Sequence, residues 1–227
     1  MALTVIIPAA GEGSRFAKVG YTDPKPFILA NGVPMIKRVA EMFPMADRIV
    51  VICRKEHVGR FNELGFHDLV VVNKKTEGAA ISVLCAESVV GDDDEIAICN
   101  SDNLFDLDLV PFFSRARKFE GAILTFEVGG GPWSYVLADV FDRVLRVAEK
   151  QQISNLATAG LYYFKTWRIL RSAICAMVAE HHTYNDEYYL APAYDFVEGN
   201  VLSYEMCPEQ FISLGTPEAL EEYHASR

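Results

Sequence analysis

The sequence predicts an α/β protein built on a Rossmann-like, mainly parallel sheet that helices flank. Short apolar runs without polar alternation recur along the chain, as expected for central strands covered on both faces. Amphipathic helical patterns separate these runs, and this alternation is typical of a doubly wound parallel sheet. After residue 128 the strands become shorter, which predicts a small antiparallel extension.

The first half of the chain, residues 1–128, supplies the regular alternation. Pro34 suits the first turn of a helix, and Gly78 precedes another apolar stripe. The expected strands are Leu3–Ile7, Arg48–Cys53, Leu69–Val72, Ile96–Cys99 and Ala122–Val128. The expected helices are Pro34–Phe43, Lys55–Leu64, Gly78–Val90 and Val110–Phe119.

The second half, residues 129–227, begins at a Gly-Gly-Gly-Pro break that is too short to separate independent domains. We therefore expect one domain over residues 1–227. The expected strands are Ser134–Leu137, Val144–Ala148, Thr158–Phe164 and Val201–Met206. The other expected elements are a helix over Trp167–His181, a helix or irregular turn over Glu187–Val197, the segment Phe211–Gly215 and a C-terminal helix from Pro217.

Charge and cysteine content limit the partners and the compartment. The formal net charge is −10, which argues against a nucleic-acid backbone or an anionic membrane surface as partner. The 5 cysteines lack metal-binding spacing, as expected for thiols in a reducing compartment. The start of the chain lacks a secretory signal pattern, and no run approaches the roughly 20 apolar residues of a membrane span. We expect a cytoplasmic protein without nucleic-acid or membrane partners.

The stretch from Ile6 to Pro26 is the strongest candidate for a binding site. A buried strand leads into a loop with Gly11 and Gly13, and glycine lets backbone N–H groups approach an anion closely. A dinucleotide fingerprint would need a third glycine where Phe16 stands, and no Walker A motif is present. The prolines at 24 and 26 also prevent a helix across this region. The cations of the loop are Arg15, Lys18 and Lys25. We therefore interpret this stretch as a phosphate-binding loop of neither of these two kinds. The alternative is an ordinary surface loop whose charges are solvated.

Further candidates follow the later strands, and each also has an ordinary explanation. Asp102 comes directly after a strand, where ligands bind in open α/β sheets, although such residues often cap turns. Glu149 and Lys150 suit a phosphorylated polyol, but on an open surface they would form a solvated pair worth under about 1 kcal/mol. Ala159 and Gly160 offer bare backbone to a ring, or simply pack closely on a neighbour.

A histidine pair and a tyrosine cluster are weaker candidates. His181 and His182 are adjacent, and neighbouring helical residues point about 100° apart, so we interpret them as a helix C-terminus rather than a metal site. The tyrosines could stack a base or a sugar, or be half-buried core residues with solvated hydroxyls. They are Tyr184, Tyr188, Tyr189 and Tyr194.

Taken together, these segments resemble the sugar-1-phosphate nucleotidyltransferases, or NDP-sugar pyrophosphorylases, which have a GT-A-like fold. The matching segments are PAAGEGSRF (8–16), DPKP (23–26), TEGAA (76–80), NSDN (100–103), AEK (148–150), TAGLYYF (158–164) and LGTPEAL (214–220). They occur in family order and cover nearly the whole chain. The resemblance implies the short, single-domain form, without the β-helix of bifunctional members. Residues 1–128 would form the nucleotide-binding half and residues 129–227 the acceptor-binding half.

The resemblance also implies a reaction and a set of residues. An NTP would transfer its nucleotidyl group to a sugar 1-phosphate and release pyrophosphate, for activated-sugar or surface-glycan synthesis. The implied catalytic residues are Arg15, Lys25 and Asp102, with Asp102 as the Mg²⁺ ligand. The implied nucleotide-binding residues are Ala10, Gly11, Gly13, Ser14, Arg15, Lys25, Gly78 and Ala79. The implied acceptor-binding residues are Glu149, Lys150 and Gly160. Such a reaction depends on positioning and charge neutralisation, and no Ser/His/Asp or Cys/His constellation is evident.

One position departs from this family. Many members carry a second metal-binding Asp where this chain has Ser213, and a hydroxyl is a weaker Mg²⁺ ligand than a carboxylate. Asp106 or Asp186 could compensate. Two alternatives stay open: a cytidylyltransferase for a non-sugar phosphate such as phosphocholine, and a catalytically silent nucleotide-binding subunit. A GT-A glycosyltransferase ranks low because Asn100 replaces the first Asp of its DxD motif. The identity of the NTP, the identity of the acceptor and the formation of a homo-oligomer also stay open.

Overall fold

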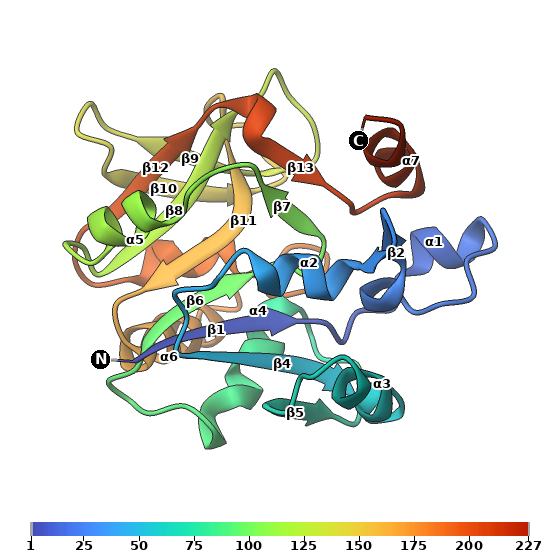
Figure 1. Ribbon diagram of the computed structural model, residues 1–227. Coiled ribbons are helices and arrows are strands. Elements are labelled where there is room, and N and C mark those ends of the chain that lie inside the picture. Colours follow the sequence, from blue (N-terminus) through green and yellow to red (C-terminus); the bar gives the residue numbers. More distant parts are fainter. Residues whose placement is uncertain (1, 227) are drawn as a thin grey trace.

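A nine-stranded mixed sheet forms the centre of the computed structural model, which describes residues 2–226 (Figure 1). The order across the sheet is β10-β9-β11-β6-β1-β4-β5, and β8 pairs with both β11 and β12. The bounds are β1 Leu3–Pro8, β4 Arg48–Arg54, β5 Leu69–Val72, β6 Glu95–Cys99, β8 Gly121–Glu127, β9 Ser134–Ala138, β10 Val144–Glu149, β11 Leu156–Phe164 and β12 Val201–Met206. Two two-stranded sheets complete the strands: β2 Leu29–Ala30 with β3 Val33–Pro34, and β7 Asn103–Phe105 with β13 Phe211–Ser213.

Short helices connect and cover these strands. The α-helices are α1 Ser14–Lys18, α2 Met35–Glu41, α3 Val58–Glu63, α4 Ala79–Leu84, α5 Val110–Ala116, α6 Trp167–Ala179 and α7 Pro217–Ala225. The 3₁₀ turns are Lys25–Phe27, Lys55–His57, Cys85–Ser88, Ala191–Phe196 and Pro208–Gln210. Within residues 2–226, none of the helices has the length and apolar character needed to span a membrane.

The parallel core consists of β6, β1, β4 and β5. β1 pairs with β4 from Thr4 opposite Arg48, and with β6 from Leu3 opposite Glu95. β6 is buried along its whole length, and β1 up to Ile7, because helices cover both faces of the sheet. This arrangement confirms the predicted fold class of a sheet with a parallel core flanked by helices.

Strand β11 joins the two halves of the chain within the same sheet. It runs antiparallel to β6, with Leu161 opposite Cys99, and antiparallel to β8 on its other side. Its register with β8 shifts between Thr158 and Tyr162, around Gly160, whose φ of +84° suits glycine. The antiparallel extension is therefore a direct continuation of the parallel core.

Two hydrophobic cores lie on opposite faces of the sheet, and β1 contributes to both by alternation. Leu3 and Val5 point into the core that α2, α3, α5 and α7 cover, where Ile36, Phe61, Phe112 and Leu220 are buried. Ile6 points into the core that α4 and α6 cover, where Val83 and Ile174 are buried. The molecule is thus three-layered, and the loops at the carboxyl ends of the central strands remain outside both layers of helices.

The structure differs from the sequence prediction mainly where elements are short. α1 forms inside the glycine-rich loop, where prolines were expected to prevent a helix; it ends at Lys18, before Pro24. The predicted helix over Gly78–Val90 divides into α4 and a 3₁₀ turn. Phe211–Gly215 supplies β13, which pairs with β7 directly after the strand-end Asp102.

Candidate active site

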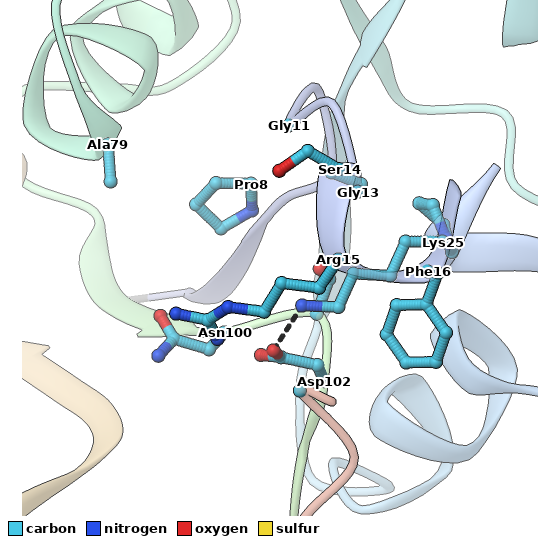
Figure 2. Close-up of a pocket in the computed structure, with 14 residues that line it drawn as sticks. Pro8, Gly11, Gly13, Ser14, Arg15, Phe16, Lys25, Ala79, Asn100 and Asp102 are labelled. Atoms are coloured by element: carbon cyan, nitrogen blue, oxygen red, sulfur yellow. Dashed lines mark hydrogen bonds and ion pairs between the residues drawn. The ribbon is translucent and has the colours of Figure 1, made fainter. Parts of the chain in front are cut away.

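A cleft opens at the carboxyl ends of β1 and β6. The arrowhead of β1 points toward α1 (Figure 1). The cleft encloses about 370 Å³. Its lining comes from the glycine-rich loop, from Lys25, from the start of α4, from Asn100–Asp102 and from Gly215 (Figure 2). Ligands of open α/β sheets bind at this edge, so the topology places these segments as the sequence predicts.

The glycine-rich loop is held in place from two sides. Gly13 has a φ of +61° immediately before α1, and a Cβ there would lie 3.0 Å from the Cβ of Lys25. Glycine therefore lets the loop pass closely over the lysine. Arg54, at the end of β4, donates from Nε to the carbonyl oxygen of Ala10 at 2.8 Å. The loop thus lies preorganised at the mouth of the cleft, with its amides near the cavity.

An ion pair joins the two halves of the cleft floor. The ammonium of Lys25 contacts the carboxylate of Asp102, as the dashed line in Figure 2 shows. The two side chains are 21% and 19% exposed, so a ligand in the cleft can reach both. The backbone N–H of Leu214 donates to the carbonyl oxygen of Asp102 at 2.7 Å, which ties the C-terminal segment to the same place.

Arg15 extends across the cleft. Figure 2 shows its side chain reaching from α1 toward Asn100, next to the Lys25–Asp102 pair. Arg15 and Lys25 are the only cations among the described residues that line this cavity. The cleft therefore presents two positive charges and one negative charge, which favours an anionic ligand.

Gly160 supports the cleft wall without lining it. A Cβ at this position would overlap the Nδ2 atoms of Asn100 and Asn103. The backbone N–H of Asn100 donates to the carbonyl oxygen of Gly160 at 2.9 Å, and Nδ2 of Asn103 donates to that of Ala159 at 2.8 Å. The bare backbone of β11 thus lets Asn100 reach the cavity.

A second hollow of about 330 Å³ continues from the cleft on the side of α4. The two share Pro8, Gly11, Gly13, Ser14 and Ala79. Gly78, at the N-terminus of α4, has a φ of +116°, and a Cβ there would lie 2.6 Å from the backbone nitrogen of Tyr188. The residues that line this hollow alone include Ala10, Arg54, Lys74, Lys75, Thr76, Gly78 and Glu187. The two hollows form one elongated, partly cationic groove.

Glu149 and Lys150 lie elsewhere, at the end of β10. Glu149 lines a separate cavity of about 190 Å³ together with Tyr184 and Tyr189, and neither Glu149 nor Lys150 lines the cleft. The Glu149 side chain is 6% exposed and accepts a hydrogen bond from Ser134. Burial raises the pKa of Glu149, while the Ser134 hydroxyl and the Lys150 ammonium oppose that shift. Residues 187–189 connect the two sites, since Glu187 lines the hollow beside α4 and Tyr189 lines the cavity of Glu149.

The donor set of the cleft fits a hard cation held by one carboxylate. Asp102 is the only carboxylate among the described residues that line the cleft; neither Asp106 nor Asp186 lines it. Ser213 lies close by, since its Oγ accepts from the N–H of Gly215 at 3.3 Å and Gly215 lies against Asp102. Across residues 2–226 there is no group of three or more His, Cys, Asp and Glu side chains suited to a metal ion. His181 and His182 lie just past α6, where their N–H groups close its last turn.

Several residues of the groove were missed by sequence reasoning, although two of them lie in segments that it singled out. Asn100 and Ser101 belong to the strand-end segment that drew attention only through Asp102. Arg54 ends β4, and its role depends on the parallel pairing that brings it beside the loop. Lys74 and Lys75 are consecutive lysines before a Thr-Glu-Gly turn, a sequence signal that could have indicated an anion site.

Comparisons with known proteins agree with this geometry. A nucleoside-diphosphate-sugar pyrophosphorylase from Vibrio cholerae superposes with a TM-score of 0.87 at 25% identity, covering 97% of this chain and 99% of that one. A putative glucose-1-phosphate thymidylyltransferase from Bacillus anthracis shares the fold, with a TM-score of 0.79 at 20% identity over 99% of this chain and 95% of that one.

Curated relatives are longer. The bifunctional protein GlmU of Caldicellulosiruptor saccharolyticus is 28% identical over 86% of this chain, and that of Methanococcus aeolicus is 25% identical over 72%. The chain spans less than half the length of these two proteins, 44% and 40% respectively. The family of MobA-like NTP transferase domains matches residues 5–163. The chain therefore belongs to the MobA-like NTP transferase family and is an NDP-sugar-pyrophosphorylase-like nucleotidyltransferase domain.

Proposed function

We propose that this protein transfers a nucleoside monophosphate from an NTP to a sugar 1-phosphate and releases pyrophosphate, supplying an activated sugar for glycan synthesis. The observation that carries the proposal is the convergence of the glycine-rich loop, Arg15, Lys25 and Asp102 on one cleft. Two cations and a preorganised loop suit a triphosphate, and a carboxylate beside them suits its Mg²⁺.

The reaction is an in-line displacement at the α-phosphorus of the NTP. An oxygen of the acceptor's phosphate forms the new P–O bond, the bond to the bridging oxygen breaks, and the electron pair leaves with pyrophosphate. The backbone of the loop and Arg15 hold the leaving phosphates. Lys25 neutralises the charge that grows on the α-phosphate. Asp102 would hold the Mg²⁺ ion, whose positive charge would neutralise part of the charge of the phosphates.

The Lys25–Asp102 contact gives this step a built-in exchange of partners. With no phosphate in the cleft, the lysine neutralises the carboxylate. An arriving α-phosphate offers Lys25 a second anion, and the carboxylate then becomes available to the metal. Lys25 and Asp102 therefore each have a partner of opposite charge before and after binding, so neither state leaves one of these partly buried charges unpaired.

We assign the nucleoside and the acceptor to different hollows of the molecule. The hollow beside Gly78 and Ala79 adjoins the triphosphate loop, and we assign it to the nucleoside. We assign the acceptor to the side of Glu149 and Lys150, with Gly160 behind the connecting wall. Glu149 would accept from acceptor hydroxyls, and Lys150 would bind its phosphate.

One screen tests the proposal. Pyrophosphate release is measured with four NTPs against a panel of sugar 1-phosphates and aminoalcohol phosphates such as phosphocholine, in the presence of Mg²⁺. Release with a sugar 1-phosphate, lost in Asp102→Asn, supports the assignment. Release with phosphocholine and CTP alone would identify the cytidylyltransferase instead. Nucleotide binding without release from any pair would identify a silent subunit, which the neutral Ser213 favours.

A further inference from the structure

Residues 184–189 form a short bridge between the nucleotide hollow and Lys150. Asn185 and Asp186 both have positive φ, 50° and 59°. The backbone groups of Tyr184 and Glu187 hydrogen-bond to each other in both directions, at 3.0 and 3.1 Å. Positive φ at both central residues is the requirement of a tight type I′ turn, and Asn and Asp tolerate it. The turn brings Tyr184 back toward Tyr189, with ring centroids 6.2 Å apart in an edge-to-face arrangement.

One side of this bridge is fixed to the nucleotide hollow. The backbone N–H of Tyr188 donates to the carbonyl oxygen of Glu77 at 2.7 Å, and the N–H of Ala80 donates to that of Tyr188 at 3.1 Å. The carboxylate of Glu187 lies 3.4 Å from the ammonium of Lys75. The bridge therefore cannot shift without moving the loop at the start of α4.

The other side of the bridge holds the side chain of Lys150. Its ammonium donates to the hydroxyl of Tyr189 at 2.8 Å and lies 4.6 Å and 4.8 Å from the ring centroids of Tyr189 and Tyr184. Burial lowers the pKa of Lys150, but the hydrogen bond to Tyr189 and the nearby Glu149 carboxylate raise it by more. The ammonium is thus kept charged and in one place.

We propose that Tyr189, with the ring of Tyr184, is a positioning residue that holds Lys150 for the phosphate of the acceptor. This inference rests on the proposed function. An ammonium has three N–H donors, and one of them is used by Tyr189. The other two can bind phosphate oxygens. A free lysine side chain would lose rotamer freedom on binding, and the two tyrosines remove that cost beforehand.

The test compares Tyr189→Phe with the wild type in the pyrophosphate-release assay, with glucose 1-phosphate and phosphocholine as acceptors. Loss of one hydrogen bond to a charged group should raise the KM for the acceptor about tenfold. The KM for the NTP should stay within about twofold, because the backbone of Tyr188 still holds Glu77 and Ala80 on either side of Gly78. Tyr204→Phe is the matched control, since this tyrosine lies on β12, away from the bridge.

Two further variants separate positioning from a general structural effect. Tyr184→Leu removes one ring beside the ammonium and should also raise the acceptor KM, by a smaller factor. In a Lys150→Met background, Tyr189→Phe should change nothing further. Equal acceptor KM values for wild type and Tyr189→Phe, or additive effects in the Lys150→Met background, would overturn the inference. Absence of release by the wild type with every NTP and acceptor would instead remove the proposed function on which it rests.

Discussion

Replacing Lys25 with methionine removes the cation that pairs with Asp102 on the cleft floor while keeping a side chain of similar length. Three measurable quantities should change together: stability, turnover and the affinity for a divalent cation without nucleotide. Lys18→Met is the matched control. It makes the same charge change on the same loop, and Lys18 does not line the cleft.

The structure sets the size of each effect. Because the two side chains are 21% and 19% exposed, water can partly solvate Asp102 once its partner is gone. The stability loss should therefore be about 1 kcal/mol, well below the roughly 3–5 kcal/mol for a fully buried pair. That corresponds to a fall in Tm of about 2–4 °C for a chain of this length. Loss of a preorganised charge at the α-phosphate should lower kcat by about 10²–10³.

Cation affinity gives a readout that does not need turnover. In the wild type a divalent ion must displace Lys25 from Asp102, and in the variant it need not. Since about 1.4 kcal/mol is a factor of ten, a contact worth about 1 kcal/mol means that Mn²⁺ should bind the nucleotide-free variant about fivefold more tightly. Titration followed by electron paramagnetic resonance measures free Mn²⁺ directly. Turnover within tenfold of wild type would refute the role of Lys25, and unchanged Mn²⁺ affinity would refute the exchange of partners.

Three more predictions concern packing and ionisation. Gly160→Ala should lower the free energy of unfolding by about 3 kcal/mol, because its Cβ overlaps Asn100 and its φ is +84°. Glu149→Gln should raise Tm at pH 7 by up to about 4 °C, because burial raises the pKa of Glu149 and the folded state disfavours its ionised form. That gain should vanish below about pH 4.3, where the carboxyl is neutral in folded and unfolded chains alike. A thiol reagent at pH 8 should spare buried Cys53, whose pKa burial raises to about 11. It should label exposed Cys85, Cys175 and Cys207.

Each of these has a simple control. Gly59 lies in α3, and a Cβ added there would have no atom within 4 Å, so Gly59→Ala should leave the stability unchanged or raise it. An equally small effect of Gly160→Ala on stability would contradict the overlap of its Cβ with Asn100. Glu63→Gln removes the charge of an exposed glutamate. If this control variant raised the Tm more than Glu149→Gln does, the burial argument for Glu149 would be contradicted. Labelling of Cys53 before the protein unfolds would show that its thiol is accessible.

The parallel core could be predicted from the sequence because its signal is local. Apolar runs of strand length, such as the one in β1, admit few other structures when helices separate them. The glycine-rich loop was also recognisable from composition, and the cleft does form there. Short elements could not be predicted, because β7 and β13 are three residues each and exist only through their mutual pairing.

The structure brings several of the predicted site residues to one cleft, but their mutual geometry could not be predicted from the sequence. Lys25 and Asp102 were both expected near the triphosphate, but nothing local shows that the two contact each other across 77 positions. Glu149 was expected at the lip of the same pocket and instead lines a separate cavity. The sequence shows which residue types are present on β10. Which of their side chains line a cavity depends on the 3₁₀ turn that packs against this strand, and sequence spacing does not show that packing.

Strand β11 has a consequence for how the enzyme can move. It is hydrogen-bonded to β6 and β8 of residues 1–128 and to β9 of residues 129–227, so one sheet runs through both halves of the chain without a hinge. Rotation of one half against the other would break this ladder. Any closure around substrates must therefore come from the loops at the sheet edge. Hydrogen exchange should accordingly slow in these loops when nucleotide binds, while the amides of β11 keep the same protection with and without substrate.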